Sequence, residues 1–415
     1  MLTCGGAGGE PFTLPTEVDG VPHMLMIGPS GMGKSTLLGA MTCAFLQEPN
    51  ARVFILDVGR SSYVLARCLG ADWFNVGGDD SQPLCPLAAL DQGEKGLQWL
   101  ADWFERLFAR WPDESGLSNT KFSLGEDELE DFISSLRQCR TPRPGEERVY
   151  DLLGLRAKIR GGVHARTRIR KVLYKYVTDY GHIFGGSSES ASTARVTVYE
   201  IGELLRMSQK FAAPAMELIL HSIMSQLDGT HRSWVFIDEF WSVLGDETAA
   251  DELYTWLRTF RKLNCGIIAS SQSLIEIARS PMCGLLIESM PGLILLPNPR
   301  AYSPRIRDMY LDLGVSEHET SIIAGSTPHR DFLYTSPKGA RLASLNTGPV
   351  GQAIYGSTSD AEVQRAQQIW KEHPTTEAFT DAWLRERVPG WQPGVQQLAA
   401  ADIPDGWGVR TQPAQ

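Results

Sequence analysis

Residues 28–35 read GPSGMGKS and match the pattern G-x-x-x-x-G-K-[ST]. An apolar run precedes them, MLMI at 24–27, and suits a buried strand, while TLLGAMTCAFL at 36–46 suits a buried helix. This strand–loop–helix setting is the one a phosphate-binding loop requires, which favours a binding site over a simple glycine turn. Glycines let successive backbone N–H groups face a polyphosphate at the positive end of the following helix.

The loop predicts ATP and Mg²⁺ as ligands. We expect Lys34 to reach the β- and γ-phosphates and the Ser35 hydroxyl to hold Mg²⁺. The contacts with bound nucleotide are expected along the whole loop and its first helical residues: Gly28, Pro29, Ser30, Gly31, Met32, Gly33, Lys34, Ser35 and Thr36.

A second motif, WVFIDE at 234–239, is an apolar strand that ends in two carboxylates. We expect Asp238 to hold the Mg²⁺ shell. Glu239 is then the residue that orients or deprotonates the attacking water. A strand followed by an acidic loop is the plain alternative, and the phosphate loop makes the catalytic interpretation the stronger one. The roughly 200 residues between the two motifs exceed any ordinary connection, so the sequence predicts an insertion between them.

Composition bounds the class of protein. The chain has 415 residues, 42% hydrophobic and 21% charged, which is ordinary for a globular protein of two or three domains. No apolar run approaches the roughly 20 residues of a membrane span, and no secretory signal is visible at the start. The seven cysteines are scattered without a C-x-x-C pair, which argues for reduced thiols in a cytoplasmic protein and against a zinc site. The net charge of −10 does not indicate nucleic-acid binding by the surface as a whole.

The order of patterns along the chain predicts an α/β protein: a mainly parallel sheet with an inserted all-helical domain. Residues 1–90 and 187–360 form the two parts of the nucleotide-binding domain, 91–186 the helical domain, and 361–415 C-terminal helices with a loose tail. One apolar helical face supports the insertion: Leu97, Leu100, Trp103, Phe104, Leu107 and Phe108. The expected strands are 52–57, 196–199, 234–237, 266–271, 293–296 and short ones within 331–357, and the expected helices include 212–227 and 248–262.

Other polar residues are candidates for the same site. Asp57 ends the strand at 52–57 and is equally well explained as a site residue or as a strand-end carboxylate. Gln272 follows the strand at 266–271, and strand ends meet at the nucleotide crevice of such sheets, so we favour a role in sensing the γ-phosphate or orienting water. Several basic residues are candidates for a transition-state cation supplied by a neighbouring subunit: Arg258, Arg261, Lys262, Arg300 and Arg330. For the first three, a solvated helix face is the alternative, and taken alone it is the stronger interpretation.

The segment 155–175 carries eight basic residues and no acidic one. A contact with a polynucleotide, an anionic lipid or an acidic partner is conceivable. A solvated helix face that offsets an acidic chain explains it equally well. The aromatic residues at its end, Tyr174 within the segment and Tyr176 directly after it, are too few to indicate base stacking.

Several motifs in order resemble one family over roughly residues 10–360. The runs are HMLMIGPSGMGKSTLL, VFILDVGRSS, WVFIDEFWSVL, FRKLNCGIIASSQS, IESMPGLILLPNPRA and TPHRDFLYTSPKGARL. They are similar to the C-terminal motor domain of conjugal-transfer ATPases, the TrbE-like energisers of type IV secretion systems, whose full-length members are longer.

The resemblance implies a RecA-like P-loop NTPase core, ATP hydrolysis, and a ring-like homo-oligomer, often a hexamer. It also implies a place at the cytoplasmic face of the bacterial inner membrane, beside other secretion-system components. Lys34 and Ser35 match the family's phosphate loop, Asp238 and Glu239 its acidic strand end, and Gln272 its glutamine motif. Arg258, Arg261 and Arg330 lie in motifs where the family carries basic residues. A DNA translocase or DNA-coupling ATPase of the same superfamily, and a nucleotide-stabilised scaffold of the channel, are the alternatives.

Overall fold

The computed structural model describes residues 2–6, 10–78, 82–112, 121–142, 144–145, 147–187, 194–239, 249–280 and 283–392, with the backbone alone at 249–254. The chain divides into two compact units. The sheet unit comprises Met1–Trp73, Thr193–Glu200 and Leu227–Gln415, and the helical unit comprises Phe74–Ser192 and Ile201–Gln226.

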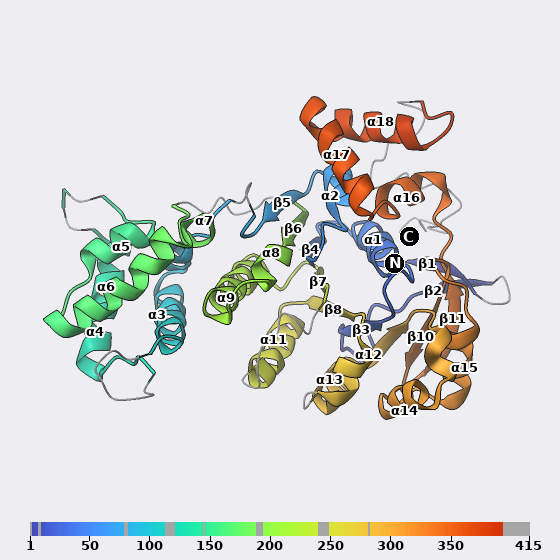
Figure 1. Cartoon of the computed structure of the whole chain (residues 1–415), viewed down its shortest axis with the longest axis horizontal. Helices are drawn as coiled ribbons and strands as arrows, with labels where there is room; N and C mark the ends of the chain where they lie inside the picture. Colours follow the sequence, from blue (N-terminus) through green and yellow to red (C-terminus); the bar gives the residue numbers. More distant parts are fainter. Residues whose placement is uncertain are drawn as a thin grey trace. The chain divides into compact units, whose positions relative to one another are not determined.

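In the described part of the chain, eleven strands form one sheet in the order β2-β1-β11-β10-β9-β3-β8-β7-β4-β6-β5 (Figure 1). The six strands from β9 to β6 in that order run parallel, and β10, β11, β1 and β2 add an antiparallel extension. The predicted mainly parallel α/β core is therefore confirmed. The strands are β1 Thr3–Gly6, β2 Pro11–Thr13, β3 Met24–Ile27, β4 Arg52–Asp57, β5 Asp72–Asn75, β6 Val196–Glu200, β7 Ser233–Ile237, β8 Cys265–Ser271, β9 Gly292–Leu295, β10 Asp331–Ser336 and β11 Gly339–Ser344.

The central strands are buried along their whole length and mostly apolar, because both faces of the sheet are covered. Every residue of β3 (MLMI) and β7 (SWVFI) is buried. Continuous apolar strands of this kind are typical of parallel sheets with helices on both faces. The helices of this unit are α1 Lys34–Phe45, α2 Tyr63–Leu69, α11 Ala249–Lys262, α12 Leu274–Arg279, α13 Cys283–Ser289, η2 Pro299–Tyr302, α14 Pro304–Asp312, α15 Glu317–Gly325, α16 Gly348–Tyr355, α17 Asp360–Glu372 and α18 Thr376–Arg387.

The expectation of strands throughout 331–357 is wrong at its end. Strands β10 and β11 occupy 331–344, and helix α16 follows at Gly348–Tyr355. Pro349 stands in the first turn of α16, where a missing N–H costs nothing. Ala353 and Ile354 are buried against the core shared with α1 and α2, three and four residues after Val350, which is helical spacing. Of the predicted C-terminal part, α17 and α18 are helical, and residues 393–415 lie outside the described residues.

The helical unit consists of short and medium helices around an aromatic core. The six residues of the predicted apolar face on 97–108 are all buried. The helices are η1 Pro86–Gln92, α3 Glu94–Ala109, α4 Glu126–Arg140, α5 Leu152–Lys158, α6 Val163–Thr178, α7 Gly181–Phe184, α8 Gly202–Leu205 and α9 Gln209–Ser225. None of the described helices is long and apolar enough to cross a bilayer.

The boundaries of this unit differ from the predicted 91–186. It also contains residues 201–226, whereas β6 between them belongs to the sheet. The reason is side-chain pairing: the Trp103 indole of α3 donates to the carbonyl of Pro214 in α9 at 3.1 Å. Arg106 of α3 pairs with Glu217 of α9 at 2.9 Å. Helix α9 therefore completes the helical unit, although its position in the sequence suggested the nucleotide-binding domain.

A close approach between α1 and α16 generates a stability prediction. A Cβ added to Gly39 would lie 2.3 Å from Cβ of Tyr355, a distance that requires a backbone shift. We expect Gly39→Ala to lower the free energy of unfolding by about 1–3 kcal/mol, as overpacking does. Gly284→Ala in α13 is the matched control, since nothing lies within 4 Å of its Cβ position. That change should be neutral or stabilising by up to about 1 kcal/mol. Equal melting temperatures for both variants would contradict the close helix contact.

Candidate functional site

The phosphate loop lies at the carboxyl end of β3, in the middle of the parallel sheet. Gly31 and Gly33 adopt φ angles of 77° and 98°, which favour glycine, and α1 begins at Lys34. Gly28 donates its N–H to the carbonyl of Ser271 at 3.2 Å. A Cβ on Gly28 would lie 2.4 Å from Cβ of Leu296. The loop therefore packs between β8 and Leu296, the residue after β9. Its positive φ angles and this close packing both require glycine.

Lys34 joins the two motifs that the sequence separates by about 200 residues. Its Nζ lies 2.8 Å from Oδ1 of Asp238 and 2.9 Å from Oε1 of Glu239. The Lys34 side chain is 7% exposed. Burial alone would lower the pKa of Lys34, but the charges and hydrogen bonds of the two carboxylates outweigh it and raise the pKa. The lysine is therefore a buried, charged ammonium held by two acids.

The acidic strand end is held in place by its neighbours. The Asp238 N–H donates to the carbonyl of Leu56 on β4 at 2.9 Å. The hydroxyl of Ser270 on β8 donates to Oδ1 of Asp238 at 2.8 Å. Glu239 has a φ of 47°, which is uncommon for a non-glycine residue. Such backbone strain persists where surrounding structure enforces it, often at functional sites, and here it accompanies a carboxylate aimed at Lys34.

Two more carboxylates stand at the same edge of the sheet. Asp57, at the end of β4, accepts from the hydroxyl of Ser61 and the N–H of Ser62 at 2.7 and 2.9 Å. Glu200, at the end of β6, accepts from the N–H groups of Gly59 and Arg60 at 3.2 and 2.6 Å. Burial, and then the nearby charge of Glu200, raise the pKa of Asp57 to about 7. These acids order the loop after β4 beside Asp238. Asp57 is a candidate from the sequence, whereas Glu200 is not, because its only signal is its place at a strand end.

Gln272 follows β8, directly beside the phosphate loop. Ser271, the residue before it, pairs with Ile27 in the parallel register of β8 and β3. The Gln272 side chain is exposed. The backbone of Gln272 lies next to the phosphate loop. Its role in sensing the γ-phosphate or orienting water stays a prediction.

The predicted basic residues lie at different ends of the sheet. Arg330 follows His329, whose N–H donates to the carbonyl of Met32 at 3.3 Å and whose Cα would be 3.1 Å from a Cβ on Gly33. The segment around 329 thus covers the phosphate loop, a contact that sequence reasoning missed. The Arg330 side chain is 66% exposed and lies 3.5 Å from Asp331.

Arg261, in contrast, lies near the amino end of β3. Its guanidinium is 3.7 Å from the Cβ position of Gly20, and its charge acts on His23, the residue before β3. His23 also lies 2.9 Å from the carbonyl of Leu257, the residue before Arg258. Arg258 and Arg261 therefore belong to the edge of the sheet opposite the phosphate loop of their own chain. Their action on a neighbouring subunit's site, like that of Arg300 in η2, stays a prediction.

Comparison with known proteins finds relatives named for conjugal transfer and for type IV secretion. No family model matches the chain. The chain is 29% identical over 400 residues to the conjugal transfer protein TrbE of Rhizobium radiobacter, covering 92% of this chain and 45% of that protein. It is 23% identical to the type IV secretion system protein VirB4 of Bartonella henselae, covering 91% of this chain and 46% of that protein. The resemblance to the TrbE-like conjugal-transfer ATPases is confirmed. The chain spans about half the length of these curated relatives.

Solved structures agree on the fold. VirB4 of Thermoanaerobacter pseudethanolicus superposes with a TM-score of 0.63 and 16% identity, covering 85% of this chain and 98% of that one. The bacterial conjugative coupling protein TrwB gives a TM-score of 0.53 and 17% identity, covering 83% and 88%. The predicted α/β fold with a mainly parallel core sheet is shared with both structures.

The raised pKa of Asp57 generates a prediction for stability. Below about pH 4 this carboxyl is protonated in both the folded and the unfolded state and contributes nothing. Between about pH 4 and 7 only the unfolded chain ionises, so the parent loses stability as pH rises. The asparagine of Asp57→Asn stays neutral at every pH. The melting temperature of this variant minus that of the parent should therefore increase as the pH rises over this range, measured in buffer without metal or nucleotide.

The contradicting result is a melting-temperature difference between Asp57→Asn and the parent that does not change with pH. It would show that Asp57 is ionised in the folded protein throughout the range.

Proposed function

We propose that this chain is the Mg²⁺-dependent ATPase motor of a bacterial type IV secretion or conjugation machine. It energises assembly of the channel or transport of substrate through it. The observation that carries the proposal is the buried Lys34 ammonium held between Asp238 and Glu239 at the mouth of a glycine-rich loop. Its support from outside the chain is the likeness to TrbE and VirB4 over more than 90% of its length.

The residues present fit ATP and Mg²⁺. The N-terminus of α1 has no side-chain cap, so its N–H groups and those of the loop are available to phosphate oxygens. Ser35, at the second position of α1, and Asp238 would hold the metal. When bound, Mg²⁺ neutralises charge that develops on the β- and γ-phosphate oxygens. A solved structure of TrwB contains ADP and Mg²⁺, which supports this ligand pair for a similar fold.

Lys34 has two sets of partners in the proposed cycle. Without nucleotide it neutralises Asp238 and Glu239, which would otherwise be two adjacent, partly buried carboxylates. A triphosphate entering the loop offers Lys34 stronger anionic partners. Its move toward the phosphates frees Asp238 for the metal and Glu239 for water. The same ammonium would thus pair either with the two acids or with the phosphates.

Glu239 is the proposed general base. Its side chain is 23% exposed, against 8% for Asp238, so it is the acid that water reaches. In the cycle it orients water for in-line attack on the γ-phosphate and takes up its proton. Gln272, beside the phosphate loop, would sense the γ-phosphate or help to orient that water.

The assembly is also part of the proposal. A homo-oligomer, most simply a hexamer, would bring Arg258, Arg261 or Arg330 of one subunit to the nucleotide of the next, where a cation stabilises transition-state charge. The machine would work at the cytoplasmic face of the inner membrane with other secretion-system components. The likeness in fold to the coupling protein TrwB keeps a DNA-coupling role as the second candidate. DNA-stimulated ATPase activity with a steep salt dependence would favour that candidate.

Lys34→Ala tests the phosphate loop. Because it removes a charged donor to the transferred phosphate, we expect kcat to fall at least about a hundredfold. Lys371→Ala, an exposed lysine of α17, is the matched control and should leave phosphate release unchanged. Undiminished turnover by Lys34→Ala would reject the assignment of the site.

Glu239→Gln separates hydrolysis from binding. The amide keeps the shape of the side chain but cannot accept the water's proton, so hydrolysis should slow by about 10²–10⁴-fold. The dissociation constant for ATP should stay within a few fold of the parent value, measured with a fluorescent ATP analogue. Turnover equal to that of the parent in this variant would remove Glu239 from the mechanism. If the parent itself forms ATP-dependent oligomers but does not hydrolyse ATP, a scaffold role is favoured instead.

A further inference from the structure

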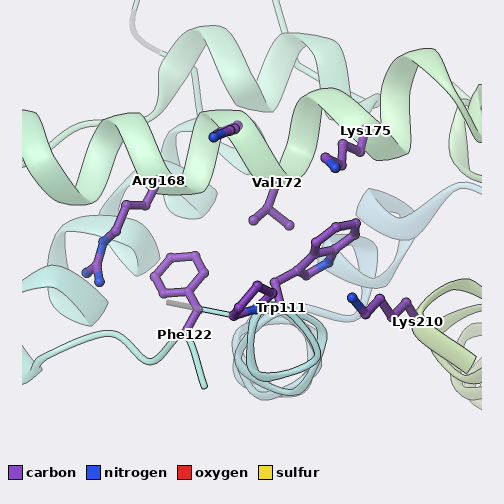
Figure 2. A pocket seen from close by; sticks show the side chains of 8 residues that line it. Trp111, Phe122, Arg168, Val172, Lys175 and Lys210 are labelled. Atoms are coloured by element: carbon purple, nitrogen blue, oxygen red, sulfur yellow. The ribbon is translucent and has the colours of Figure 1, made fainter. Parts of the chain in front are cut away.

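A basic pocket with an aromatic floor lies wholly inside the helical unit. Its lining comes from three separate parts of the chain, shown in Figure 2, and its volume is about 160 Å³. One face of helix α6 supplies four lining residues at spacings of 3, 4 and 7. The lining residues are Trp111, Pro112, Phe122, Arg168, Lys171, Val172, Lys175 and Lys210.

The cations of this pocket lie over its rings. Nζ of Lys175 and Nζ of Lys210 are each 4.7 Å from the centroid of the Trp111 ring. The guanidinium of Arg168 lies 4.6 Å from the centroid of Phe122 and pairs with Glu128 at 3.0 Å. In Figure 2 Arg168, Val172 and Lys175 extend from one helix toward Trp111 and Phe122, and Lys210 approaches from another.

Neither Lys175 nor Lys210 forms an ion pair within the described residues. The nearby carboxylate of Glu217 is used by Arg106 and Arg110 at 2.9 and 3.2 Å. Two cations over one ring, without an ion-pair partner among the described residues, make this place electropositive, and such a place attracts an anion.

Trp111 itself is held in position. Its ring makes edge-to-face contacts with Tyr176 and Phe211, with centroids 6.3 and 5.9 Å away. Tyr176 is fully buried and donates to the carbonyl of Lys210 at 2.6 Å. The indole is therefore a rigid platform, whereas the two lysines over its ring have flexible stems that can turn to a ligand.

We propose that this pocket binds single-stranded nucleic acid, with one base on Trp111 and the flanking phosphates on Lys175 and Lys210. Aromatic rings that alternate with cations are how proteins bind single strands without sequence preference. The pocket is smaller than the roughly 300–1,000 Å³ of sites for drug-sized molecules, and its flat aromatic floor suits a single base. The sequence analysis found too few aromatic residues in 155–175, because the rings come from residues 111 and 122.

The test is binding of a fluorescein-labelled oligodeoxythymidine to the full chain, followed by fluorescence anisotropy without ATP. Trp111→Leu should weaken the affinity about 5- to 150-fold, as loss of base stacking does. Trp111→Phe keeps a ring and should retain most of the affinity. The double variant Lys175→Gln, Lys210→Gln should lower the slope of log affinity against log salt by about 1.4, since each phosphate contact on a single strand contributes about 0.7.

Matched controls separate the pocket from general charge. Arg160→Gln removes a cation from the same basic segment, on an exposed residue that does not line the pocket, and should leave the affinity within twofold. Lys34→Ala should bind the oligonucleotide normally, so failure of the ATPase proposal leaves this result intact. Thermal melting of each variant shows that it is folded.

Three outcomes would overturn the proposal. The first is equal binding of the parent and folded Trp111→Leu. The second is equally tight binding of polyglutamate, which would show capture of charge without stacking. The third is no binding of the oligonucleotide but binding of phosphatidylglycerol vesicles that the double lysine variant loses, which would assign the pocket to a membrane surface.

Discussion

The ion pairs of Lys34 with Asp238 and Glu239 are the constraint on which the sheet unit depends. An ammonium buried to this degree must be neutralised, because an unpaired charge in such surroundings is costly. Its partners end a strand about 200 residues away in the sequence. The pairing register of that strand with β4 and β8 therefore cannot shift by even one residue. A shift of one residue would move the side chain of Asp238 to the opposite face of the sheet.

The strand order explains how the register is kept. Strand β8 lies between β3 and β7, and its carboxyl end holds one neighbour on each side: the Ser271 carbonyl binds Gly28, and the Ser270 hydroxyl binds Asp238. Parallel strands bring their carboxyl ends to one edge, so the phosphate loop, the acidic pair and Gln272 share that edge. Asp57 at the end of β4 and Glu200 at the end of β6 also lie at this edge and accept hydrogen bonds from the loop after β4. The segment at His329 covers Gly33. The site therefore consists of neighbouring strand ends that are joined by hydrogen bonds.

The helical unit illustrates a different use of charge. Most of the described acidic residues that contact a cation in this unit form ion pairs with arginines. Glu217 pairs with Arg106 and Arg110, and Glu128 pairs with Arg168. Lys175 and Lys210 instead lie over an indole. Cation–π contacts of this kind are worth less than an ion pair with phosphate. A pocket built in this way keeps its cations ordered and still able to bind an anion.

The local patterns identified the phosphate loop, the acidic strand end and the parallel core, because these motifs are short and their chemistry depends on neighbours in the sequence. They also identified the buried face of α3. Patterns failed where partners come from far along the chain: α9 belongs to the helical unit through Pro214 and Glu217, and α16 is helical where strands were expected. The contact of Lys34 with both acids, the role of His329, the raised pKa of Asp57 and the joining of Trp111 to the lysines of α6 and α9 were decided by the tertiary structure alone. Each depends on burial and on distances between distant segments, which no periodicity in the sequence records.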